Sequence, residues 1–167
     1  MKWWKTPQAA VLWTVLRLWF GFTWLTAGWD KIVREGGFDA SGFLNAALTK
    51  TEGAHPQVLG WYGTFLEKFA LPNIELFNVL VVWGEFLVGL GLIIGFLTRP
   101  ALYAAALMNL SFLLTGETGV NPVYYTIAIL LLVVGSGTYY WGVDRFALPV
   151  IKKKFFKKKE QATVNAS

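Results

Sequence analysis

The sequence contains no cysteine and a single histidine, His55. Without cysteine, the chain cannot perform thiol–disulfide exchange or hold an iron–sulfur cluster through thiolates. One histidine cannot supply both ligands of a bis-histidine haem, and no spacing typical of a metal site is present. We also find no glycine-rich phosphate loop and no serine–histidine pair. If the chain takes part in electron transfer, the carrier must be a bound small molecule or a partner subunit.

Charged residues are scarce as well. They make up 15% of the chain, whereas soluble domains contain about 25%. Hydrophobic residues account for 55%, and nine tryptophans occur within 167 residues. Tryptophan is enriched where a membrane meets water. This composition indicates a membrane protein.

Four apolar stretches are long enough to cross a bilayer, which requires ~20 mostly apolar residues. They cover residues 9–29, 74–97, 100–115 and 123–143. Short turns join the last three, so these helices must run antiparallel. The sequence therefore predicts an all-α membrane protein. We expect an antiparallel bundle of four transmembrane helices at 1–150, followed by a basic cytoplasmic tail at 151–167.

The distribution of charge predicts the topology of these spans. Ten of the fifteen basic residues fall on the side that would hold both termini, and six of them lie in the tail. The positive-inside rule then places both termini in the cytoplasm. We interpret the tail as a topology anchor that contacts anionic lipid, in preference to a nucleic-acid-binding segment. The expected location is a bacterial or archaeal cell membrane, crossed several times.

The long segment 36–73 would lie outside the cell. In its second half Trp61, Phe65 and Phe69 recur every four residues, which is one face of a helix. We expect one or two short interfacial helices here. Such a long connection is either a lid over a site between the spans or a structural cover.

Three strongly polar residues occur inside the predicted spans, namely Arg17, Glu85 and Asn109. At ~1.5 Å per residue, they lie ~12, ~18 and ~14 Å from the cytoplasmic ends of their spans. A single buried charge costs ~3 kcal/mol or more in a bilayer. We therefore expect Arg17 and Glu85 to face inward, to pair, and to share hydrogen bonds with Asn109. The alternative role for this pair is to set the order of the helices.

A polar cluster walled by Trp, Phe, Leu and Gly suits the headgroup of a quinone. Arg17 or Asn109 would donate a hydrogen bond to a quinone carbonyl, and Glu85 would pass a proton. Gly21 and Gly89 each lie four residues from one of the charges, on the same helical face. We predict Glu85 and Arg17 as catalytic residues. The predicted quinone-binding residues are Arg17, Glu85, Asn109, Gly21 and Gly89.

Charged residues also occur at both ends of the spans. Lys31 shares a helical stripe with Arg17 and marks the outer mouth, where an anionic substrate from outside would meet it. Its alternative roles are snorkelling and pairing with Glu35. At the cytoplasmic rim, we expect Asp144 to pair with Arg99.

Three stretches combine spaced glycines with these charges: RLWFGFTWLTAGWDK (17–31), GEFLVGLGLIIGFLTRPA (84–101) and GSGTYYWGVD (135–144). Together they resemble the motifs of the DoxX family, in the right order. The resemblance implies a membrane four-helix bundle related to DoxD, the large subunit of thiosulfate:quinone oxidoreductase, which works with a small partner. It implies importance, without assigned roles, for five residues: Arg17, Lys31, Glu85, Arg99 and Asp144.

Three functions follow as hypotheses. The first is a subunit of a quinone-linked oxidoreductase with the quinone as its cofactor. The second is a non-enzymatic subunit that docks or stabilises a redox complex. The third is a carrier of a small lipophilic molecule. We expect a partner redox subunit or a homo-oligomer, and no nucleic acid.

Overall fold

The computed structural model describes residues 3–151 and 153, and this part of the chain is helical without a β-strand. Most of the predicted basic tail, 151–167, lies outside the described residues. The helices are α1 (Pro7–Ile32), α2 (Ser41–Leu48), α3 (Gly60–Phe65), α4 (Ile74–Ile94), α5 (Thr98–Leu114) and α6 (Asn121–Val134). Short helical turns accompany them: η1 (Trp3–Lys5), η2 (Thr49–Thr51), η3 (Leu66–Ala70), η4 (Leu71–Asn73) and η5 (Gly135–Gly137).

Four of these helices coincide with the predicted spans. Two helical stretches are long and apolar enough to cross a membrane, namely Pro7–Ile32 and the continuous stretch Gly60–Ile94. The fourth helix is shorter than predicted, because α6 ends at Val134. Gly135 adopts a φ of 70°, which favours glycine and stops the helix. The hydroxyl of Thr138 then donates to the carbonyl of Leu131 at 2.7 Å and satisfies one of the last carbonyls of α6.

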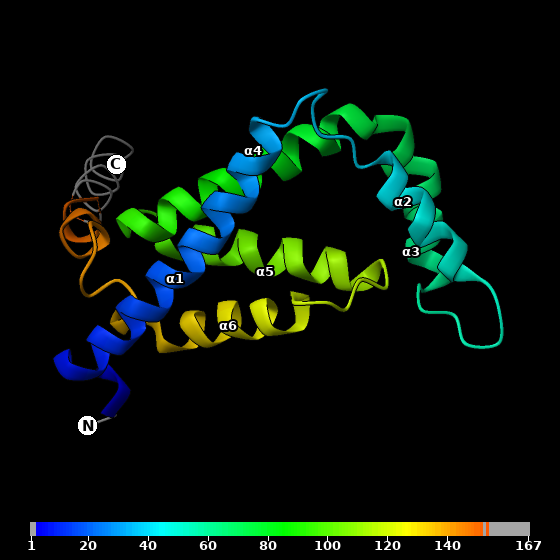
Figure 1. Ribbon diagram of the computed structural model, residues 1–167. Coiled ribbons are helices and arrows are strands. Elements are labelled where there is room, and N and C mark those ends of the chain that lie inside the picture. Colours follow the sequence, from blue (N-terminus) through cyan, green and yellow to red (C-terminus); the bar gives the residue numbers. More distant parts are fainter. Residues whose placement is uncertain (1–2, 152, 154–167) are drawn as a thin grey trace, which may run out of the picture.

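Helices α1 and α4 pack antiparallel at very close range (Figure 1). A Cβ atom at Gly28 would lie 2.5 Å from the backbone nitrogen of Phe86. A Cβ atom at Gly89 would clash with the backbone nitrogen of Leu25. Glycine lets two helix backbones approach this closely because it has no side chain. These contacts set the register of the two helices.

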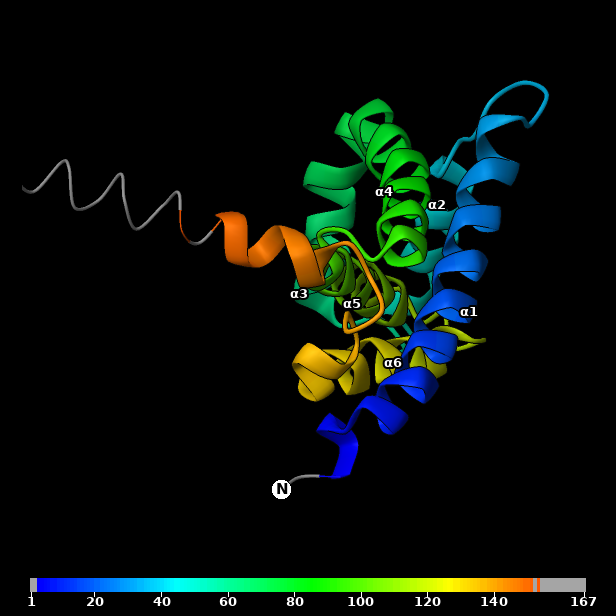
Figure 2. The ribbon, with the colours of Figure 1, turned by 90° about the vertical axis from the view of Figure 1, so that its left-hand side faces the viewer.

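The buried side chains of α1, α4, α5 and α6 form one cluster. Figure 2 shows α4, α5 and α6 stacked in this order, with α1 running along their side. Its aromatic members from α1 include Phe20 and Trp24, whose rings meet edge to face at 6.0 Å. Helix α5 contributes small residues, including Ala105 and Ala106, which allow its neighbours to approach.

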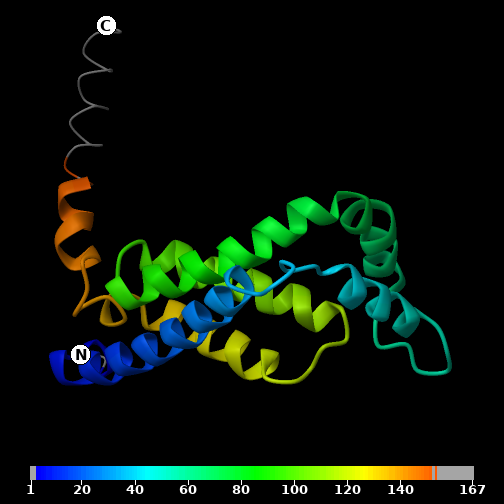
Figure 3. The same cartoon turned by 45° about the horizontal axis from the view of Figure 1, so that its top comes forward.

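A second buried cluster lies at the end of the molecule opposite the N-terminus (Figures 1 and 3). It joins α2, α3 and η3 through Leu44, Tyr62 and Leu66, and it packs against the first turn of α4 and the end of α5 at Leu114. The predicted short helices within 36–73 are therefore present. They cover one end of the helices that form the main cluster.

The stretch from α3 to α4 is one helical rod with a bend (Figure 3). The bend consists of η3, a π-helical turn, and η4, a 3₁₀ turn that contains Pro72. Both features commonly bend helices. Phe65 and Phe69 stack at 5.5 Å, and both contact Phe77 on α4. The predicted aromatic face therefore holds α3 against the beginning of α4.

Helix α2 is tied down at its start. The carboxylate of Asp39 accepts hydrogen bonds from the hydroxyl and the backbone N–H of Ser41, at 2.6 and 2.9 Å. These hydrogen bonds lower the pKa of Asp39. The backbone N–H of Ala40 donates to the side chain of Asn78 on α4 at 2.8 Å. The start of α2 is thus connected directly to α4.

We predict that Gly89→Ala lowers the free energy of unfolding by about 1–3 kcal/mol, because the added methyl group separates α1 from α4. The measurement is denaturant unfolding of the purified protein in detergent micelles. Gly42→Ala on α2 is the matched control. No atom lies within 4 Å of a Cβ at Gly42, so this change should stabilise the protein slightly. Equal effects of both changes would contradict the close packing of α1 on α4.

Candidate functional site

Lys31 and Glu85 form an ion pair between α1 and α4. The Nζ atom of Lys31 lies 2.6 Å from Oε2 of Glu85. The Glu85 side chain is only 6% exposed, and that of Lys31 is 20% exposed. Lys31 also donates to the carbonyl of Ala27, and its Nζ lies 5.5 Å from the centre of the Phe38 ring. Neither snorkelling nor a pair with Glu35 accounts for Lys31, since it turns back toward Glu85.

The predicted pair between Arg17 and Glu85 is wrong. The contacts of Gly28 with Phe86 place Glu85 beside the last turn of α1. Arg17 lies beside Gly95 instead, about 15 Å further along α4 at 1.5 Å per residue. The depth estimate failed because the two spans do not begin at the same level. The part of α1 before Arg17 extends beyond the end of α4.

Arg17 is buried at the turn between α4 and α5. Its Nη2 donates to the carbonyl of Trp141 at 3.0 Å. A Cβ atom at Gly142 would lie 2.6 Å from Nη1, and one at Gly95 would clash with it, so two glycines make room for the guanidinium. Nε and Nη1 have no hydrogen-bond partner among the described residues. The acid that acts on Arg17 electrostatically is Asp144.

Asp144 also organises this turn. Its carboxylate accepts from the backbone N–H groups of Leu97 and Thr98, at 3.0 and 2.8 Å. These are the first N–H groups of α5, where a negative charge is favourable. The predicted pair with Arg99 is absent from the described part of the chain, because the carboxylate turns to the backbone. Sequence reasoning missed this cap, since Asp144 lies 46 positions after Thr98, the first residue of α5.

Asn109 does not join either charge. Its side chain is buried, and its Nδ2 donates to the carbonyl of Ala105 one turn earlier on α5 at 2.9 Å. The predicted cluster of Arg17, Glu85 and Asn109 is therefore divided among three places. Gly21 and Gly89 serve the contact of α1 with α4.

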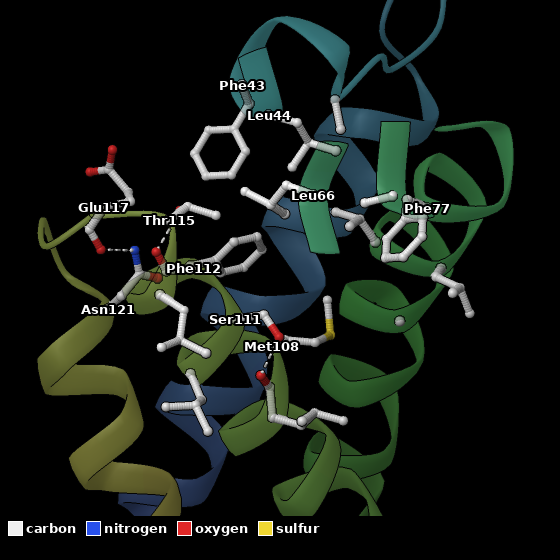
Figure 4. A pocket seen from close by; sticks show the side chains of 18 of the residues that line it. Phe43, Leu44, Leu66, Phe77, Met108, Ser111, Phe112, Thr115, Glu117 and Asn121 are labelled. Atoms are coloured by element: carbon white, nitrogen blue, oxygen red, sulfur yellow. Dashed lines mark hydrogen bonds between the residues drawn. The ribbon is translucent and has the colours of Figure 1, made fainter. Parts of the chain in front are cut away.

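A pocket of about 860 Å³ lies between the cover formed by α2 and α3 and the neighbouring parts of α4 and α5. Phe43 and Leu44 reach into it from α2, Leu66 from η3, and Phe77 from α4 (Figure 4). Met108 and Ser111 face it from α5. Its volume is within the range of small-molecule sites, which is ~300–1,000 Å³.

Both members of the ion pair line this pocket. Other polar residues on its wall lie at the end of α5, in the turn that follows and at the start of α6. They are Ser111, Thr115, Glu117 and Asn121. The hydroxyl of Tyr62 donates to the carbonyl of Ser111 at 3.2 Å and joins the cover to α5. The remaining wall is mainly aromatic and aliphatic.

The structure thus brings two of the predicted site residues, Lys31 and Glu85, into one apolar pocket. The described residues that line this pocket do not include Arg17, Gly21, Gly89 or Asn109. No group of three or more metal-ligating side chains occurs within 3–151 and 153. The pair can donate a hydrogen bond from the ammonium and can exchange a proton at the carboxylate.

Comparison with known proteins identified one family. A family model described as "TQO small subunit DoxD" matches residues 12–165. The chain belongs to the DoxD family. The matched description names the small subunit, so the expected relationship to a large subunit is not confirmed. No curated protein and no solved structure showed a significant match.

The match to the DoxD family covers α1, α4, α5 and α6 together. It therefore includes both the ion pair and the Arg17–Asp144 turn. The family assignment, together with the apolar helices, identifies the chain as a membrane protein.

We predict that Asp144→Ala destabilises this DoxD-family protein by about 2 kcal/mol or more. The change removes the acceptor for two N–H groups of α5, and it leaves the buried Arg17 without its anion. Unfolding in detergent micelles, followed by circular dichroism, measures the effect. Asp30→Ala changes an exposed aspartate of α1 and should alter stability by about 0.5 kcal/mol or less. If Asp144→Ala is equally mild, Asp144 does not hold the turn together.

Proposed function

We propose that this chain is the membrane subunit of a quinone-linked oxidoreductase of the TQO type, and that its pocket binds the quinone headgroup. The observation that carries the proposal is the Lys31–Glu85 pair on the wall of a largely apolar pocket. An aromatic and aliphatic wall suits a planar apolar ring, and few polar groups are needed to orient it. The family description, which names a TQO subunit, supports the same reading.

Each member of the pair has its own task in this proposal. The ammonium of Lys31 has three donors, and Glu85 and the carbonyl of Ala27 accept from it. It is therefore suited to donate to a quinone carbonyl as well. The carboxylate of Glu85 holds or releases a proton beside that carbonyl. A bound quinone supplies the redox chemistry by accepting two electrons and two protons to become a quinol.

The electrons must enter from elsewhere. The chain contains no cysteine, and its single histidine lies at 55, away from the residues that line the pocket. A partner redox subunit or a reduced substrate would then supply electrons to the pocket. This need for a donor is consistent with a subunit of a larger complex.

We further propose that α1, α4, α5 and α6 all cross the membrane, with both termini in the cytoplasm. The cover formed by α2, α3 and η3 then lies on the outer side. Lys31 is the second-last residue of α1, so the pocket lies toward the outer end of the bundle. This differs from the mid-membrane position that we expected from the sequence.

The test is mass spectrometry of lipid-soluble molecules that co-purify with the protein, combined with titration of a benzoquinone against purified protein. We expect the wild type to retain a quinone. Lys31→Met and Glu85→Gln should bind at least about tenfold more weakly, which corresponds to ~1.4 kcal/mol. The matched control is Glu75→Gln, at an exposed position on α4, the helix that also carries Glu85. This variant should bind like the wild type.

Helicity and elution profile establish that each variant is folded. A folded wild type that neither retains nor binds a quinone would refute the proposal. That result would favour the non-enzymatic docking subunit. Equal binding by the wild type, Lys31→Met and Glu85→Gln would place any quinone site away from this pair.

A further inference from the structure

The residues that line the pocket differ in character from one element to another. Glu117 and Asn121, at the turn between α5 and α6, are polar. The other exposed residues on its wall are all apolar: Trp61, Phe65, Leu80, Leu107 and Leu110. Their side chains are between 36% and 65% exposed. They come from three elements, α3, α4 and α5, and together we call them the apolar rim.

The apolar rim surrounds an opening between α4 and α5. Near their connecting turn these helices are in contact, since a Cβ at Gly91 would lie 3.5 Å from Cβ of Ala101. Farther out, Met108 fills the space beside Gly84, where a Cβ would lie 3.1 Å from its Sδ. Beyond Met108 the two helices leave room for the pocket. Met108 therefore forms the floor of the opening.

The surface around this opening is apolar as well. Exposed side chains continue along α4 and α5 on both sides of it, namely Leu76, Val79, Trp83, Leu87 and Tyr103. Large apolar areas on a protein surface mark contact with lipid or with a partner. In a chain whose helices cross the membrane, such a surface on α4 and α5 faces hydrocarbon.

We propose that the opening between α4 and α5 is a lateral entrance from the bilayer, and that the apolar rim seats the hydrocarbon tail of the bound quinone. This inference rests on the proposed function and adds the route by which the quinone enters the pocket and the place of its hydrocarbon tail. The headgroup would lie at Lys31 and Glu85, while the tail would pass Leu80 and Leu107 into the lipid. A tail in this position stays in contact with apolar groups along its whole length.

The flexible side chain of Met108 suits this position. Methionine is unbranched and adapts its shape to irregular apolar partners. It lines the pocket beside Gly84, the neighbour of Glu85 in the sequence, and can adjust its shape to a bound ring or tail. Phe65 of the apolar rim stacks on Phe69 at 5.5 Å, which holds its ring in place on the pocket wall.

The test compares two probes, decyl-substituted benzoquinone and the same ring with a methyl group in place of the decyl chain. Affinities are measured in one detergent for the wild type, Leu80→Trp and Leu107→Trp. We expect the preference for the decyl probe over the methyl probe to fall at least about fivefold in both variants. Affinity for the methyl probe should change less than about twofold, since the headgroup site is intact.

The matched control is Leu87→Trp, an exposed position on α4 that does not line the pocket. It should keep the preference of the wild type. Leu107→Ala provides a second variant, which removes tail contact without adding bulk and should also lower the preference. An unchanged preference in both tryptophan variants, or an equal loss in Leu87→Trp, would overturn the lateral entrance while leaving the proposed function intact. Failure of the wild type to bind even the methyl probe would overturn the proposed function, and this inference with it.

Discussion

The close contact of α1 with α4 is the constraint on which the rest of the structure depends. Glycines remove the side chains that would keep the two backbones apart, and the contacts at Gly28 and Gly89 permit a single register. This register decides which charges meet. It places Lys31 beside Glu85 at one end and Arg17 beside Gly95 at the other. The contact of α1 with α4 thus places Lys31 and Glu85 at the pocket and Arg17 in a buried turn.

The two charged clusters differ in what surrounds them. Backbone groups and glycines enclose Arg17 and Asp144. Arg17 donates to the carbonyl of Trp141, and Asp144 accepts from the N–H groups of Leu97 and Thr98. These hydrogen bonds connect α1 and the α4–α5 turn with the segment that follows α6. Lys31 and Glu85 border an open volume lined by apolar side chains. Buried charges that are satisfied by backbone groups stabilise a turn, whereas an ion pair that borders a cavity is available to a ligand. The two clusters therefore differ in access: the first is enclosed, and the second borders the pocket in which we propose the quinone binds.

The sequence predicted the elements of this fold well, because apolar runs and turn residues are local signals. It correctly placed α1, α4 and α5, and it indicated the helices within 36–73. It also singled out Glu85, since a charge in an apolar run is conspicuous, and Lys31, which shares a helical stripe with Arg17. It could not predict that Lys31, and not Arg17, pairs with Glu85. The number of residues from the start of a helix gives the depth of a side chain in the membrane only when the level of that start is known. Segments that are distant in the chain form both the cap at Asp144 and the pocket, so no local sequence pattern predicts them.

The most direct test of the account is photo-crosslinking with an azido-quinone, followed by peptide mapping of the labelled protein in lipid nanodiscs. The account predicts that the label is attached to residues of the pocket wall, within 61–85 on α3 and α4 and within 104–115 on α5. Excess unlabelled quinone should suppress this labelling. Specific labelling confined to the surroundings of Arg17, outside both of these ranges, would contradict the account.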